Sequence, residues 1–182
     1  TGETELDNGL TAGFSIDIDV EFNNDDGIFV DDDDAEWSGY NVYLESETAG
    51  LYFGDTATAG EAHWDGVDGS DVGGFDEAGD NSEDAILRGE YTYGAVTAAL
   101  SYQLIENGDM EGLQVAAVAD LGNFNIIAAY QDSDNTANDG ETFGLSGSTT
   151  FGGADVMLTY LNSNTSGDSS IGASVAYPVG PV

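Results

Sequence analysis

Carboxylates are the side chains with which this sequence could do most chemistry. The 182 residues include 36 Asp or Glu against one Lys or Arg and one His, which gives a formal net charge of −35 at pH 7. Clustered carboxylates are the ligands that hard cations such as Ca²⁺ prefer, and a pair of carboxylates can hydrolyse a glycosidic bond. Because acidic residues are spread over the whole chain, no single pair stands out as catalytic.

The strongest candidate for a site is the acidic segment 56–85, which is too long to be a plain connection between two strands. We expect it to attract cations, with calcium as a candidate ligand. Its carboxylates are Glu61, Asp65, Asp68, Asp71, Asp76, Glu77, Asp80, Glu83 and Asp84.

The chain lacks the residues that several other common catalytic and metal-binding sites require. The chain has no Cys, its one basic residue is Arg88, and His63 is its single histidine. A thiolate site, a cluster of histidines and a Lys-containing phosphate loop are therefore excluded. The acidic stretch 132–141 lacks the full pattern of a calcium-binding EF-hand loop. The net charge also excludes nucleic-acid binding through a basic patch, so we expect neither an enzyme nor a nucleic-acid partner.

The segment "GFSIDIDVEF", residues 13–22, indicates which elements carry these carboxylates. Its even positions are apolar, whereas Asp17, Asp19 and Glu21 occupy odd positions. Strict alternation predicts a β-strand, because successive side chains point to opposite faces of a sheet. One face of this strand is therefore apolar and the other acidic.

Similar alternating segments recur through the chain, and helical periodicity is nearly absent. The sequence therefore predicts an all-β fold. The expected strands are 10–22, 36–47, 51–55, 86–93, 96–104, 112–121, 124–131, 141–151, 155–161 and 170–177, with 1–6 as the end of an eleventh.

The connections between these strands alternate strictly between short and long. Tight turns are expected at 7–9, 48–50, 94–95, 122–123, 152–154 and 178–181, and long acidic connections at 23–35, 56–85, 105–111, 132–140 and 162–169. In an up-and-down meander, this alternation puts all tight turns at one end and all long loops at the other, as in outer-membrane β-barrels. A soluble, secreted acidic β-sandwich that binds calcium or carbohydrate is the alternative, but it has no reason to keep this asymmetry.

Aromatic residues near the strand ends agree with a barrel in a membrane. Tyr93, Phe124, Phe151 and Tyr177 fall near the tight turns, and a second set, Phe22, Tyr102, Tyr130 and Tyr160, falls near the long loops. Two such rows are typical of the aromatic girdles at the two membrane interfaces.

Two stretches resemble the general porins of Gram-negative bacteria, in particular the Rhodobacter type of α-proteobacteria. "GETELDNGLTAGFSIDIDVEF" resembles an early porin hairpin, and "YNVYLESETAGLYFGDT" is similar to the two strands that precede the third loop. The resemblance implies a transmembrane antiparallel up-and-down β-barrel in the bacterial outer membrane, surrounded by lipid. It also implies a homotrimer, and that 56–85 is the constriction loop that folds back into the barrel.

Two departures from the family pattern affect these expectations. Family members have 16 strands, whereas ten to eleven are visible here, so we expect residues 1–182 to form a single, incomplete porin-like barrel domain. Porins also place basic residues on the barrel wall where this chain has Asp17, Asp19, Glu21 and Asp55.

These arguments predict a passive diffusion channel for small hydrophilic solutes and ions that selects cations. In "ILRGEYTY" the alternation sends Arg88 and Glu90 into the lumen, where we expect Arg88 to pair with a carboxylate of the constriction loop. The expected pore-lining residues are Asp17, Asp19, Glu21, Glu45, Glu47, Arg88 and Glu90.

Overall fold

The computed structural model describes residues 1–20, 35–67, 75, 85–104, 110–133, 140–164 and 167–177, and the side chains of 17–20, 35–38, 110–111 and 168 fall outside this description. The strands are β1 (Gly2–Glu5), β2 (Thr11–Val20), β3 (Ala35–Glu45), β4 (Ala49–Gly54), β5 (Ala85–Tyr93), β6 (Val96–Leu104), β7 (Met110–Asp120), β8 (Phe124–Ser133), β9 (Gly140–Phe151), β10 (Ala154–Ser163) and β11 (Asp168–Ala176).

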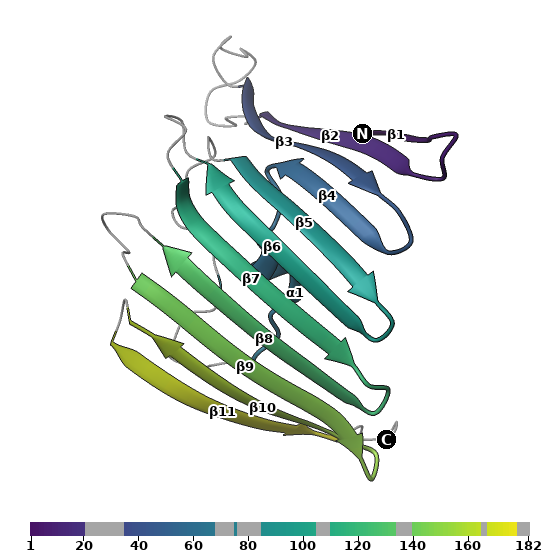
Figure 1. Ribbon diagram of the computed structural model, residues 1–182. Helices are drawn as coiled ribbons and strands as arrows, with labels where there is room; N and C mark the ends of the chain where they lie inside the picture. Colours follow the sequence, from purple (N-terminus) through teal and green to yellow (C-terminus); the bar gives the residue numbers. More distant parts are fainter. Residues whose placement is uncertain are drawn as a thin grey trace, which may run out of the picture.

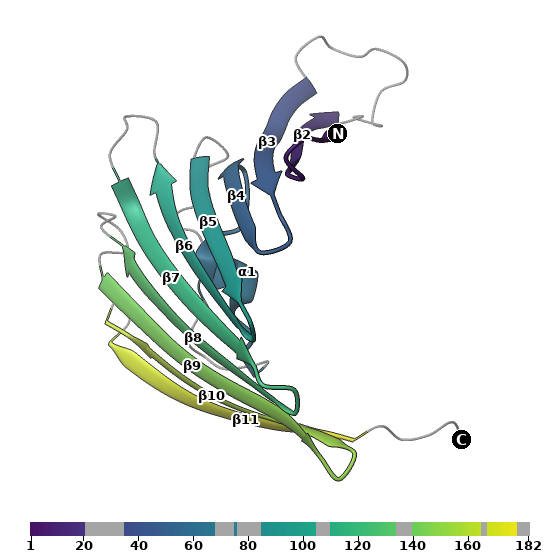
Figure 2. The same cartoon turned by 45° about the vertical axis from the view of Figure 1, so that its right-hand side comes forward.

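The strands form one antiparallel sheet in which every strand pairs with its neighbours in sequence (Figure 1). The predicted all-β, up-and-down fold is thus confirmed, and β6 has the bounds that the sequence predicts. The sheet is strongly curved (Figure 2), but β1 and β11 do not pair with each other, so it is open in the described part of the chain.

One element of the structure was not expected from the sequence. A helix of five residues, α1 (Ala59–His63), follows β4 and lies on the concave side of the sheet (Figure 2). Within the described residues, no helix is both long and apolar enough to span a membrane.

The tight turns lie along one edge of the sheet, as the alternation of connection lengths predicts (Figure 1). Gly94 and Gly122 occupy turns of this edge with φ of 62° and 83°, which residues with a Cβ rarely adopt. Such left-handed positions are what two-residue hairpin turns require.

The convex face is apolar and exposed. Leu51, Gly89, Leu100 and Val115 form one row across neighbouring strands, and the three with side chains are 40 to 50% exposed. Further exposed apolar side chains include Phe14, Ile126, Leu145, Leu158 and Ile171. A water-soluble protein does not expose an apolar surface this extensive, whereas a lipid-facing surface is apolar.

The concave face has the opposite character. Its buried side chains are largely polar, among them Ser101, Gln103, Gln114, Ser146 and Thr159. The aromatic residues at the tight-turn ends are exposed, from 58% for Phe124 to 81% for Phe151, as expected for the girdle at one interface.

Candidate functional site

The segment after β4 folds onto the concave wall, beginning with a helix that is fixed by its own cap. The Thr58 hydroxyl accepts a hydrogen bond from Glu61 N at 3.2 Å, and the Glu61 carboxylate accepts one from Thr58 N at 3.3 Å. This reciprocal pair is a capping box, which satisfies two backbone donors at the start of a helix. The Thr-x-x-Glu spacing was present in the sequence as a signal for α1.

Two wall side chains hold the N-terminus of α1. Ala59 N donates to Ser101 Oγ on β6 at 2.8 Å, and Gly60 N donates to Gln114 Oε1 on β7 at 2.9 Å. Both bonds are buried, so the first N–H groups of the helix, which have no intrahelical partner, are satisfied by the wall. The polar residues of β6 and β7 therefore receive the loop rather than face open solvent.

Arg88 lies on β5 beneath the same segment. Its side chain is 9% exposed, its Nη1 donates to Ala57 O at 2.8 Å, and its guanidinium lies 4.3 Å from the centroid of the Tyr52 ring. Its Nε has no hydrogen-bond partner in the described part of the chain. Among the described residues Arg88 contacts a backbone carbonyl and an aromatic face. Its expected pairing with a carboxylate of the loop stays a prediction, because most of these carboxylates lie outside the described residues.

A chain of polar contacts continues from Arg88 along the wall. His63 Nε2, at the end of α1, lies 2.9 Å from Glu90 Oε2 on β5, and each side chain is 20% exposed. Tyr52 on β4 donates its hydroxyl to Glu45 Oε1 on β3 at 2.6 Å. Nothing in the sequence indicated a partner for His63. Its contact with Glu90 joins residues 27 positions apart, so no local pattern marks it.

The far part of the loop packs against the wall through aromatic rings. Trp64 and Phe75 meet edge to face with ring centroids 5.1 Å apart, and Phe75 is 2% exposed. They complete a small apolar cluster with residues of the wall, which consists of Ala59, Phe75, Ala99, Ala116, Ala129, Leu161 and the partly buried Trp64.

Glycines on the wall make room for this packing. A Cβ on Gly144 of β9 would lie 2.6 Å from Trp64 and 2.8 Å from Phe75, and a Cβ on Gly172 of β11 would lie 2.9 Å from Val67. Side chains at these positions would push the loop away from the wall. The segment 56–67 and Phe75 thus cover the concave face over β5–β11.

The structure places only some of the expected site residues. Glu90 and Glu45 lie in the polar contacts above, Glu47 lies in the turn between β3 and β4, and Glu61 and Asp65 are exposed on the loop. Eight expected residues lie wholly outside the described residues, and two more, Asp17 and Asp19, are described only as backbone on β2. The eight are Glu21, Asp68, Asp71, Asp76, Glu77, Asp80, Glu83 and Asp84.

The described residues offer no support for a metal centre. No group of three or more Asp, Glu, His or Cys side chains among them is arranged to hold a metal ion. Most carboxylates of the segment 56–85, for which calcium was a candidate ligand, lie outside the described residues.

A curved antiparallel meander, with an apolar convex face, a polar concave face and a loop folded onto the concave wall, has the architecture of a membrane β-barrel channel. Residues 1–182 match the family of Gram-negative porins, and the chain belongs to that family. It is therefore a porin, a channel protein of the bacterial outer membrane.

Solved structures of a porin from Rh. blastica have a similar fold. One mutant of that porin aligns with a TM-score of 0.52 at 16% sequence identity, over 97% of this chain and 78% of that chain. A second mutant aligns with a TM-score of 0.51 at 15% identity, over 97% and 77%. A triple mutant aligns with a TM-score of 0.50 at 16% identity, over 99% and 78%. The comparison with curated proteins gives no match.

Proposed function

We propose that this porin is a cation-selective channel through which ions and small hydrophilic solutes diffuse passively. The observation that carries the proposal is the position of Arg88, the single Lys or Arg among 182 residues. Its guanidinium is covered by the loop and bonded to Ala57 O, so it adds little positive potential to the lumen. Fixed charge on the water-filled side of the wall is then carboxylate alone.

Several described carboxylates can act on ions in the lumen. Glu61 and Asp65 are exposed on the loop, and Asp155 is exposed on β10. The sequence alternates acidic and apolar positions over 13–22, and we propose that Asp17, Asp19 and Glu21 extend the acidic wall. Rings of carboxylates attract cations and repel anions at distances up to about 10 Å in 0.1 M salt.

The loop supports a limit on solute size. Hydrogen bonds from Ala59, Gly60 and Arg88, the His63–Glu90 contact and the aromatic cluster all hold the segment against the wall. A segment fixed at so many points can define a reproducible pore width, and we propose that 56–85 is the constriction loop.

We also propose that the channel is surrounded by outer-membrane lipid and by other copies of the same chain. The exposed apolar side chains of the convex face suit contact with outer-membrane lipid. Their exposure does not favour the alternative of a soluble β-sandwich. The family resemblance supports assembly as a homotrimer, and crosslinking in native membranes followed by denaturing electrophoresis would show three copies.

The reversal potential of the purified channel under a KCl gradient across a planar bilayer tests the selectivity. We expect a potential of the sign that cation flow gives, which declines as both salt concentrations rise because counterions screen the wall. Neutralising Asp17, Asp19 and Glu21 to Asn and Gln should move it toward zero. Arg88→Ala should leave the preference for cations intact.

The Asp7→Asn variant, at an exposed turn of β1 and β2, is the matched control and should leave the potential unchanged. Anion selectivity in dilute KCl would overturn the proposal.

A further inference from the structure

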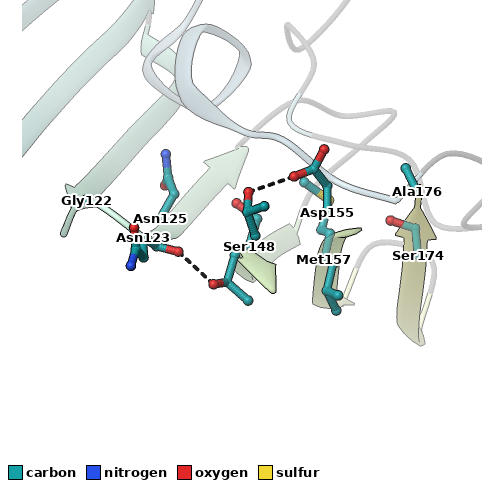
Figure 3. A pocket seen from close by; sticks show the side chains of 11 residues that line it. Gly122, Asn123, Asn125, Ser148, Asp155, Met157, Ser174 and Ala176 are labelled. Atoms are coloured by element: carbon teal, nitrogen blue, oxygen red, sulfur yellow. Dashed lines mark hydrogen bonds between the residues drawn. The ribbon is translucent and has the colours of Figure 1, made fainter. Parts of the chain in front are cut away.

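A second polar site lies on the concave wall, away from the loop. The tight-turn ends of β8–β11 line an open hollow of about 340 Å³. Asn125, Ser148, Met157 and Ser174 pair in register across the four strands, so their side chains share one face (Figure 3). The volume lies at the low end of the range for ligand pockets, which suits one small molecule.

The hollow combines donors and acceptors of known orientation. Asn125 lines the hollow, its Oδ1 is buried without a partner among the described residues, and its Nδ2 is a hydrogen-bond donor (Figure 3). Asp155 Oδ1 accepts a hydrogen bond from the Thr150 hydroxyl at 2.7 Å, which orients the carboxylate and leaves Oδ2 as an acceptor. The hydroxyls of Ser148 and Ser174 can both donate and accept.

These groups discriminate between classes of ligand. An anion would meet the Asp155 carboxylate with no basic side chain among the lining residues. A simple ammonium ion would use Asp155 but could accept nothing from Asn125 Nδ2. Neighbouring hydroxyls of a polyol can donate to Asp155 and accept from Asn125 at once, and the Met157 and Ala176 side chains offer apolar contact to its carbon skeleton.

We propose that this hollow is a weak binding subsite for neutral polyhydroxylated solutes, such as a monosaccharide. The inference rests on the proposed function, because it names a solute class that would pass through the channel. Ser148 lies four residues along β9 from Gly144, the residue against which Trp64 of the loop packs. Four residues span about 13 Å at the rise of a β-strand. The subsite is thus on the tight-turn side of the constriction, where a solute that has passed the loop would pause.

The test measures ion conductance of single channels in planar bilayers while glucose is titrated. We expect conductance to fall along a saturable curve, beyond the linear fall that viscosity causes. Asn125→Ala and Asp155→Ala should each weaken the apparent affinity about 3- to 10-fold, the effect of one lost hydrogen bond. Asp7→Asn removes a charge at the same edge, outside the lining residues, and should leave the glucose curve unchanged.

The outcomes separate this inference from the proposed function. A linear glucose effect, equal in all variants of a conducting channel, would overturn the subsite and leave the channel function standing. Glucosamine that binds more tightly than glucose, with a loss only in Asp155→Ala, would overturn the polyol assignment in favour of a cation site. An absence of conductance in the unmodified protein would overturn the proposed function itself, and the subsite with it.

Discussion

Arg88 shows how burial changes the role of a residue. An Arg that faces a lumen would oppose the acidic wall, but Arg88 is covered, bonded to Ala57 O and stacked on Tyr52. The contacts of a guanidinium with a carbonyl oxygen and an aromatic face are stronger when the group is removed from water than when it is exposed to water. The one basic side chain therefore helps to hold the loop in place, and in the proposed channel it would add little to the charge that ions meet.

The contact between His63 and Glu90 gives a prediction at the same scale. His63→Ala and Glu90→Ala each remove the 2.9 Å contact between the end of α1 and β5, so we expect larger open-channel current noise from a more mobile loop. The double variant should be no noisier than either single variant, because both lose the same interaction.

Asp65→Ala is the control for this experiment, because it removes an exposed carboxylate two residues beyond His63. Its current noise should match that of the unmodified channel. Noise that simply adds in the double variant would show that His63 and Glu90 act independently.

At the scale of elements, the loop and the wall fit each other through small residues. Alanines of β6, β7 and β8 lie under Ala59 and Phe75, and glycines of β9 and β11 lie under Trp64 and Val67. Large side chains at these wall positions would force the loop outward, since packed interiors tolerate little extra volume. The sheet is therefore shaped to receive this loop.

Gly144→Ala tests this fit. Its Cβ would lie 2.6 Å from Trp64, so we expect the indole to move away from the wall. In a Trp37→Phe background, Trp64 is the single tryptophan, and its fluorescence should become more sensitive to quenching by iodide. Single-channel conductance should change in the same variant.

Gly147→Ala is the matched control on β9, because a Cβ there would meet nothing within 4 Å. Its quenching and conductance should equal those of the parent. Equal behaviour of both variants would contradict the seating of Trp64 on Gly144.

At the scale of the whole molecule, the two faces of the sheet differ in whether they tolerate a charged side chain. Leu100 on the convex face and Thr97 on the concave face lie three residues apart on β6. Leu100→Arg should lower the free energy of unfolding by roughly 2–4 kcal/mol if it lies near the bilayer midplane. Thr97→Arg should cost much less, because its side chain can reach water in the lumen. Urea titration of the protein in lipid vesicles measures both, and equal losses would contradict the assignment of faces.

The orientation of the meander gives a prediction for cells. The chain has no Cys, so single cysteines report cleanly on access to a membrane-impermeant maleimide. Ala95→Cys and Asn123→Cys lie at tight turns, whereas Asn164→Cys lies at the opposite edge. We expect only Asn164→Cys to react on intact cells, and all three after lysis. Reaction of the tight-turn cysteines on intact cells would contradict the topology.

Much of the fold could be predicted from the sequence because it depends on local pattern. The two-residue alternation in 96–104 predicted β6, the face of Leu100 and the face of Ser101, since neighbouring side chains of a strand point to opposite sides. The alternation of short and long connections predicted the meander, because consecutive antiparallel strands return to the same edge. The resemblance of two stretches to porins was also visible in the sequence, and the match of residues 1–182 to the porin family confirms it.

The site depended on contacts between distant parts of the chain, which no periodicity encodes. Gly60 meets Gln114 and Arg88 meets Ala57 across 54 and 31 positions, and the path of the loop brings each pair together. The sequence established that the chain has one basic side chain and an acidic polar face. Only the tertiary structure decided that this basic side chain is buried, because burial depends on which segment covers it.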